Sequence, residues 1–149
     1  MTYSQWFKQH GEKHAKIMQK LTHLSDNEVI EYFRFENMVE KEPDFCPLYA
    51  KNQKCHDMEQ LNCYLCACPY FRFNDDGLYI KEKRIYYSDC SIHAKKGKKF
   101  IAENAVHQDC SLCLLPHKVS FIQKIFKREW FAMMQECNSI ALQSPQGKD

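Results

Sequence analysis

The cysteines constrain this chain more than any other feature. Nine occur in 149 residues, and eight of them lie between positions 46 and 113. In a reducing compartment thiols persist unless a metal binds them, whereas an oxidising compartment favours disulfides. The N-terminal segment has no apolar stretch typical of a secretion signal, and an odd number of cysteines is unfavourable to a complete disulfide framework. We therefore predict a cytoplasmic protein whose cysteines bind metal.

Two pairs of these cysteines have the spacing of metal-binding turns. Cys63/Cys66 and Cys110/Cys113 are each separated by two residues, which lets a tight turn direct both sulfurs to one ion. Cys68 adds a crowded third thiol beside the first pair, so more than one metal, or a cluster, is implied. The predicted ligands are Cys46, Cys55, Cys63, Cys66, Cys68, Cys90, Cys110 and Cys113.

A short internal echo supports the assignment of Cys90. Residues 89–93 read Asp-Cys-Ser-Ile-His and residues 109–113 read Asp-Cys-Ser-Leu-Cys, so His93 stands where the second segment has Cys113. Similarity over five residues is common by chance, and the echo only weakly suggests His93 as a ligand. For His56 and His117 we predict hydrogen bonds to thiolates or helix capping rather than ligation.

Other candidate ligands have simpler interpretations. Cys137 lies on an apolar helical stripe, where a free cysteine acts as a small hydrophobe. His10 and His14 have the spacing of a helical chelate but no third ligand nearby, so we predict that they lie partly exposed at the edge of the core. The lysines at 95–99 are predicted to belong to a solvated loop.

Zinc is the favoured metal, with an iron–sulfur cluster as the alternative. The paired turns and a central segment poor in apolar runs favour a structural zinc, whose binding supplies folding free energy. The crowding of Cys63, Cys66 and Cys68 and the proline that follows them are typical of ferredoxin-type runs. Spacing alone does not pair the ligands.

The expected fold class is mainly α, with a small, irregular, metal-tied cysteine-rich core that carries a short β-hairpin. Apolar periodicity predicts a helix near residues 3–22, and Ser25 followed by Glu28 is a capping box that begins a second helix. We predict a single domain. Its parts are an N-terminal helical part (1–43), the metal-binding core (44–117), a C-terminal helix (118–138) and a flexible tail (139–149).

Residues 44–126 resemble the cysteine-rich small domain family. The similarity rests on two motifs, Asn-Cys-Tyr-Leu-Cys-Ala-Cys-Pro-Tyr at 62–70 and Asp-Cys-Ser-Leu-Cys-Leu-Leu-Pro-His at 109–117. Cys46, the Cys55-His56 pair and Cys90 follow the same order as in that family. The resemblance implies a zinc-finger-like, metal-binding domain without an assigned reaction.

The sequence favours a metal-binding protein with an accessory or interaction role, through a protein partner that it does not identify. One alternative is an iron–sulfur redox or sulfur-transfer enzyme with Cys68 as nucleophile. Another is a nucleic-acid-binding zinc module that uses Lys95–Lys99, although 21 basic and 19 acidic residues are too balanced to favour a polyanionic partner. No glycine-rich nucleotide loop or hydrolase triad is recognisable, which argues against independent catalytic machinery. No stretch has the length of apolar sequence that a membrane span needs.

Overall fold

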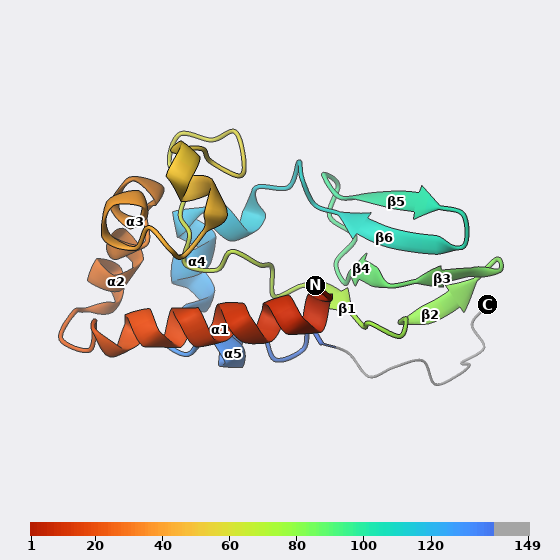
Figure 1. Ribbon diagram of the computed structural model, residues 1–149, viewed down its shortest axis with the longest axis horizontal. Coiled ribbons are helices and arrows are strands. Elements are labelled where there is room, and N and C mark those ends of the chain that lie inside the picture. Colours follow the sequence, from red (N-terminus) through yellow and green to blue (C-terminus); the bar gives the residue numbers. More distant parts are fainter. Residues whose placement is uncertain (139–149) are drawn as a thin grey trace. The chain divides into compact units, whose positions relative to one another are not determined.

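The computed structural model describes residues 1–138, in which helices come before and after a run of short strands along the sequence (Figure 1). The helices are α1 (Tyr3–Gln19), α2 (Asp26–Tyr32), α3 (Phe35–Lys41), α4 (Val119–Ile125) and α5 (Trp130–Met133), with 3₁₀-helices η1 (Pro47–Lys51) and η2 (Leu115–His117). The strands are β1 (Phe71–Phe73), β2 (Tyr79–Lys81), β3 (Arg84–Tyr86), β4 (Ser88–Cys90), β5 (Lys98–Ala102) and β6 (Ala105–Asp109). The tail predicted at 139–149 lies outside the described residues.

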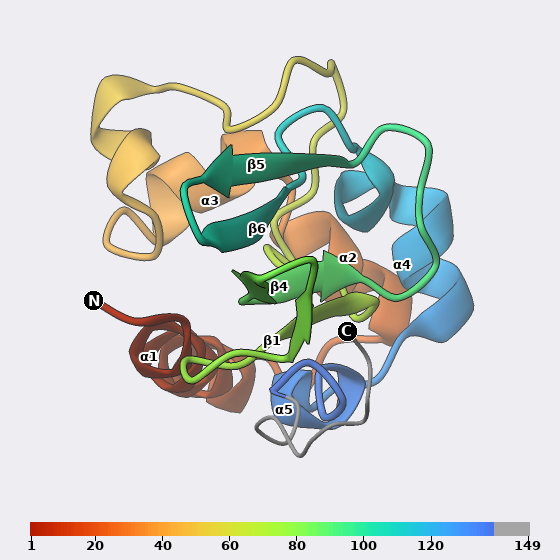
Figure 2. The same ribbon diagram turned by 90° about the vertical axis from the view of Figure 1, so that its right-hand side faces the viewer.

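The described residues form a mixed α/β structure, with 36% helix and 18% strand in two sheets, so the prediction of a mainly α fold around an irregular cysteine-rich core is wrong. One sheet has the order β2-β3-β6-β5 and the other pairs β1 with β4. Figure 2 shows β5 and β6 side by side. Apart from the hairpin, these strands escaped prediction because β1 and β4 span only three residues each, too few to establish an alternating pattern, and because β5 is exposed along its whole length.

The predicted hairpin is confirmed in β2 and β3, which pair antiparallel with Tyr79 opposite Tyr86. Their connection consists of Glu82 and Lys83, both with positive φ (53° and 67°). Two successive residues of this kind are typical of a type I′ turn, whose twist matches that of the flanking strands. The hairpin is followed directly by β4, which ends at Cys90.

The chain forms two compact units. The first contains Met1–Lys8, Pro69–Cys113 and the described residues from Met134 onward, and the second contains Gln9–Cys68 and Leu114–Met133. In the first unit Phe73, Val106 and Cys137 are buried. In the second the largest buried side chains include those of Trp130 and Tyr64. Five predicted metal-ligating cysteines belong to the second unit and three to the first.

The predicted second helix is divided into α2 and α3. Its start is as expected, because the Ser25 side chain accepts from the Glu28 amide and the Glu28 side chain accepts from the Ser25 amide. The division follows from backbone pairing with a distant segment: the Cys63 amide donates to the Phe33 carbonyl (2.7 Å) and the Phe35 amide to the Leu61 carbonyl (3.0 Å). This pairing fixes the backbone at Cys63.

The predicted helix over 118–138 is also divided, into α4 and α5. The Lys127 carbonyl accepts from the Tyr64 hydroxyl (2.7 Å), and the buried Trp130 indole donates to the Leu65 carbonyl (2.7 Å). Phe126 has an extended backbone at the end of α4. Where the helix is interrupted between α4 and α5, this part of the chain is held by hydrogen bonds to residues 64–65.

Candidate metal centre

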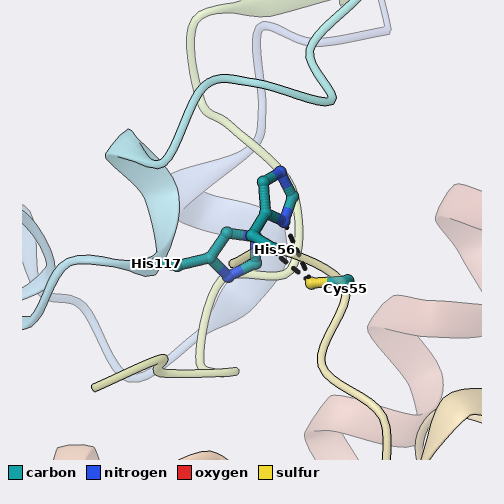
Figure 3. A group of neighbouring side chains, drawn as sticks. All are labelled: Cys55, His56 and His117. Carbon is teal, nitrogen blue, oxygen red and sulfur yellow. Dashed lines mark hydrogen bonds between the residues drawn. The ribbon is translucent and has the colours of Figure 1, made fainter. Parts of the chain in front are cut away.

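Three potential metal ligands converge in the second unit (Figure 3): Cys55, His56 and His117, whose ligand atoms all lie within 4.8 Å of one another. The Cys55 sulfur lies 3.1 Å from Nδ1 of His56 and 3.7 Å from Nε2 of His117. The two imidazole centroids are 4.5 Å apart. His117 is 62 positions from Cys55, so folding brings it to the Cys55-His56 pair.

These separations suit a tetrahedral ion. With Zn–S of about 2.3 Å and Zn–N of about 2.0–2.1 Å, a sulfur and a nitrogen ligand on one zinc lie roughly 3.5 Å apart. The observed 3.1 and 3.7 Å fall on either side of this value. Small side-chain rotations would therefore accommodate an ion between the three ligands.

Hydrogen bonding fixes the tautomer of His117. Its Nδ1 lies 3.1 Å from the Asn62 carbonyl oxygen, which can only accept, so Nδ1 carries the proton. Burial, opposed by this hydrogen bond, lowers the pKa of His117 to about 4, which keeps the ring neutral near pH 7. The lone pair of Nε2 therefore points toward Cys55. Metal-binding histidines commonly have this arrangement, in which the other ring nitrogen donates to a carbonyl.

Asn62 connects two segments of this site that are distant in the sequence, the Asn-Cys segment and the Pro-His segment. Its amide donates to the His117 carbonyl (3.1 Å), which makes the contact with His117 reciprocal. Its buried side chain donates to the Ile30 carbonyl and accepts from the Tyr64 amide, each at 2.8 Å. Asn62 thus holds His117 in place through backbone and side-chain bonds.

The loop that carries Cys55 and His56 is held by Lys54. Its ammonium donates to the carbonyls of Met58 (2.9 Å) and Glu59 (2.8 Å), which closes the loop around the pair. A hollow of about 610 Å³ borders Cys55, His56 and Asp57. The site therefore has a path by which an ion could enter from solvent.

The Cys63–Cys66 turn lies beside this group. Cys66 has a left-handed φ of 51°, and its thiol donates to the Cys63 carbonyl (3.2 Å). A hydrogen bond from the Cys66 thiol, opposed by burial, lowers the pKa of Cys63, and the neighbouring Tyr49 hydroxyl acts in the same direction. Of the two thiols in this turn, that of Cys63 therefore ionises more readily.

The remaining thiols of the second unit repel one another when ionised. Partial burial and the nearby Cys63 and Cys46 thiols raise the pKa of Cys55 to about 11. Hydrogen bonding to Cys63, burial and the charges of Cys63, Cys55 and Cys46 raise the pKa of Cys66. Such a group accumulates negative potential as it ionises, and a bound cation would relieve it.

The other predicted ligands are placed differently. Cys68 is partly buried at the end of the second unit and lies outside the group around Cys55. Cys90 ends β4, and Cys110 and Cys113 form the turn that follows β6; all three belong to the first unit. The structure therefore divides the eight predicted ligands between two sets.

The histidines singled out in the sequence have different outcomes. His56 and His117 each approach the Cys55 sulfur at hydrogen-bonding distance, as predicted. His10 and His14, predicted at the edge of the core, are buried in it at 5% and 0% exposure. The sequence feature that pointed to His117 is the Pro-His end of the 109–117 motif, but residue spacing alone could not show that His117 lies near Cys55 in the fold.

No protein-family model matches this chain, and comparison with curated proteins and with solved structures found no match. The resemblance to the cysteine-rich small domain family therefore stays a prediction. Within residues 1–138, no helix has both the length and the apolar character needed to cross a membrane.

Proposed function

We propose that this chain is a metal-binding protein that holds zinc through Cys55, His56, His117 and Cys63. The single observation that carries the proposal is the convergence of one sulfur and two imidazole nitrogens within 4.8 Å, from segments far apart in the sequence. We propose Cys63, whose charge acts on the Cys55 thiol, as the fourth ligand of a Cys₂His₂ set.

The donor chemistry favours zinc over an iron–sulfur cluster. Structural zinc sites commonly combine thiolates with neutral imidazoles, whereas most iron–sulfur clusters are held by four cysteines. His117 meets the requirement of a neutral imidazole because its pKa is near 4. Its Nδ1–H bond to the Asn62 carbonyl is the expected outer support of such a ligand.

The proposed role of the metal is structural, in support of an accessory or interaction function. Residues 52–60 contain no helix or strand and are mostly exposed, so few packing interactions order them. Bound zinc would connect this loop through Cys55 to His117, and its binding free energy would become folding free energy. A shaped, ordered loop beside an open hollow suits recognition of a protein partner.

The test is elemental analysis of zinc, iron and acid-labile sulfide in the full chain purified without oxygen. We expect zinc and no sulfide. The His117→Gln variant should lose this zinc, because the amide lacks the imidazole lone pair but can still occupy the space.

His23→Gln is the matched control, since His23 is an exposed histidine outside the site. It should keep the wild-type zinc content. Stoichiometric iron with sulfide would replace the zinc proposal with the iron–sulfur alternative, and an unchanged zinc content in His117→Gln would remove His117 from the site.

A further inference from the structure

We infer a second zinc site in the first unit, formed by Cys90, His93, Cys110 and Cys113. It rests on the pairing of two chain segments and does not depend on the site around Cys55. The first observation is the register of β3 and β6, which run parallel with Ile85 opposite Ala105 and Tyr86 opposite Val106. Each residue thus faces the one 20 positions later in the sequence.

Hydrogen bonds between the same two segments continue beyond the end of β3. The Tyr87 amide donates to the Val106 carbonyl (2.9 Å), and the Gln108 amide donates to the Ser88 hydroxyl (2.7 Å). Ser88 begins β4, which therefore continues beside β6 in the same direction (Figure 1). β4 ends at Cys90 and Cys110 directly follows β6, so these two cysteines are again separated by 20 positions.

The sequence echo has this same offset. Asp-Cys-Ser-Ile-His at 89–93 and Asp-Cys-Ser-Leu-Cys at 109–113 begin 20 residues apart. A chance repeat has no reason to match the strand register. The agreement indicates that the two motifs occupy equivalent positions at the same end of neighbouring parallel strands.

The two motifs also fold alike. The His93 amide donates to the Cys90 carbonyl (3.2 Å), and the Cys113 amide donates to the Cys110 carbonyl (3.0 Å), so each motif closes a tight turn between its potential ligands. The Ala94 amide donates to the Cys90 sulfur (3.4 Å), a contact that stabilises a thiolate. These turns have the i, i+3 geometry by which two ligands reach one ion.

The chemistry follows from this placement. The two turns contain three cysteines and one histidine, a Cys₃His set that would suit tetrahedral zinc once these side chains turn toward one ion. Unlike those of Cys55, His56 and His117, their ligand atoms do not already converge within 4.8 Å. Cys90 is 8% exposed, whereas Cys110 and Cys113 are partly exposed and His93 is exposed. The site would therefore lie at the surface of the unit, anchored by Cys90 and accessible to an incoming ion.

The first test is zinc stoichiometry of the full chain. We expect about two zinc ions in the wild type, and about one in Cys110→Ser/Cys113→Ser. The variant Cys55→Ser/His117→Gln should also keep about one, and Cys137→Ala, a buried cysteine outside both sets, should keep both. Zinc that is lost only in the Cys55/His117 variant overturns this inference, whereas zinc lost only in the Cys110/Cys113 variant overturns the site around Cys55.

A second measurement avoids variants that fail to fold. Wild-type protein is treated with N-ethylmaleimide before and after zinc is removed by a chelator, and modified cysteines are identified by peptide mass spectrometry. We expect Cys90, Cys110 and Cys113 to be protected together and to become reactive together. Modification of Cys110 and Cys113 at full rate in the zinc-loaded protein overturns the second site.

Discussion

Acidification should unfold this protein through two histidines buried in the second unit. The His14 ring is fully buried, stacks on Phe33 and meets Tyr64 edge-on. Its Nε2–H donates to the Tyr64 carbonyl (3.0 Å), whereas Nδ1 has no partner among the described residues. A proton on Nδ1 would therefore place a charge and an unsatisfied donor in an aromatic core.

The direction and size of the effect follow from the two pKa values. Burial and the neighbouring Lys13 lower the pKa of His10 to about 4; burial and the neighbouring His10, opposed by the Tyr64 hydrogen bond, lower that of His14 to about 3. Below pH 6.5 the unfolded chain binds protons that the folded chain does not, so stability falls as pH decreases. At pH 4.5 each histidine costs about 2–3 kcal/mol, a large part of the roughly 5–15 kcal/mol that stabilises a typical domain.

The assay is urea unfolding at pH 7.0, 5.5 and 4.5, followed by tryptophan fluorescence, on the wild type and on His14→Gln. Glutamine keeps a donor for the Tyr64 carbonyl but does not titrate. Acid release of zinc affects both proteins, so the difference between them isolates His14. His14→Gln should lose about 2–3 kcal/mol less than the wild type between pH 7.0 and 4.5. Equal losses in the two proteins would refute the reasoning; His23→Gln should behave as the wild type.

Three further predictions concern the hydrogen bonds and the metal. Asn62→Ala should destabilise the protein by about 2–4 kcal/mol, because the Ile30 carbonyl and the Tyr64 amide lose buried hydrogen-bond partners. Chemical denaturation measures this loss of unfolding free energy, and a change below about 0.5 kcal/mol would contradict the prediction. Ser25→Ala should cost about 1 kcal/mol through the lost helix cap, whereas Ser25→Asn, which can still cap, should restore most of it. Chelation of zinc should speed amide hydrogen exchange in residues 52–60, and unchanged exchange there would argue against a structural metal.

Local signals in the sequence predicted local structure well. The capping box before α2 requires only Ser25 and Glu28, and its two hydrogen bonds form as expected. The β2–β3 hairpin likewise depends on a few adjacent residues. In both cases the interacting groups are near in sequence, so spacing alone contains the information.

The boundaries of the later helices depend on distant groups and could not be predicted. The separation of α2 from α3 depends on backbone bonds from residues 33–35 to 61–63. The end of α4 coincides with the bond from the Tyr64 hydroxyl to the Lys127 carbonyl. Apolar periodicity predicts which residues are buried, but it does not say which carbonyl a remote side chain will reach.

The candidate ligands likewise include some that local spacing indicates and others that only the fold brings together. A Cys-x₂-Cys turn is local, and the sequence identified Cys63 and Cys66 from their spacing. His117 reaches Cys55 because its ring and backbone are fixed on Asn62, a contact between residues 55 positions apart. In the first unit, the parallel register of β3 and β6 has the same 20-residue offset as the five-residue echo at 89–93 and 109–113. The echo alone was poor evidence for His93, but its agreement with the strand offset links two local turns into one testable four-ligand site.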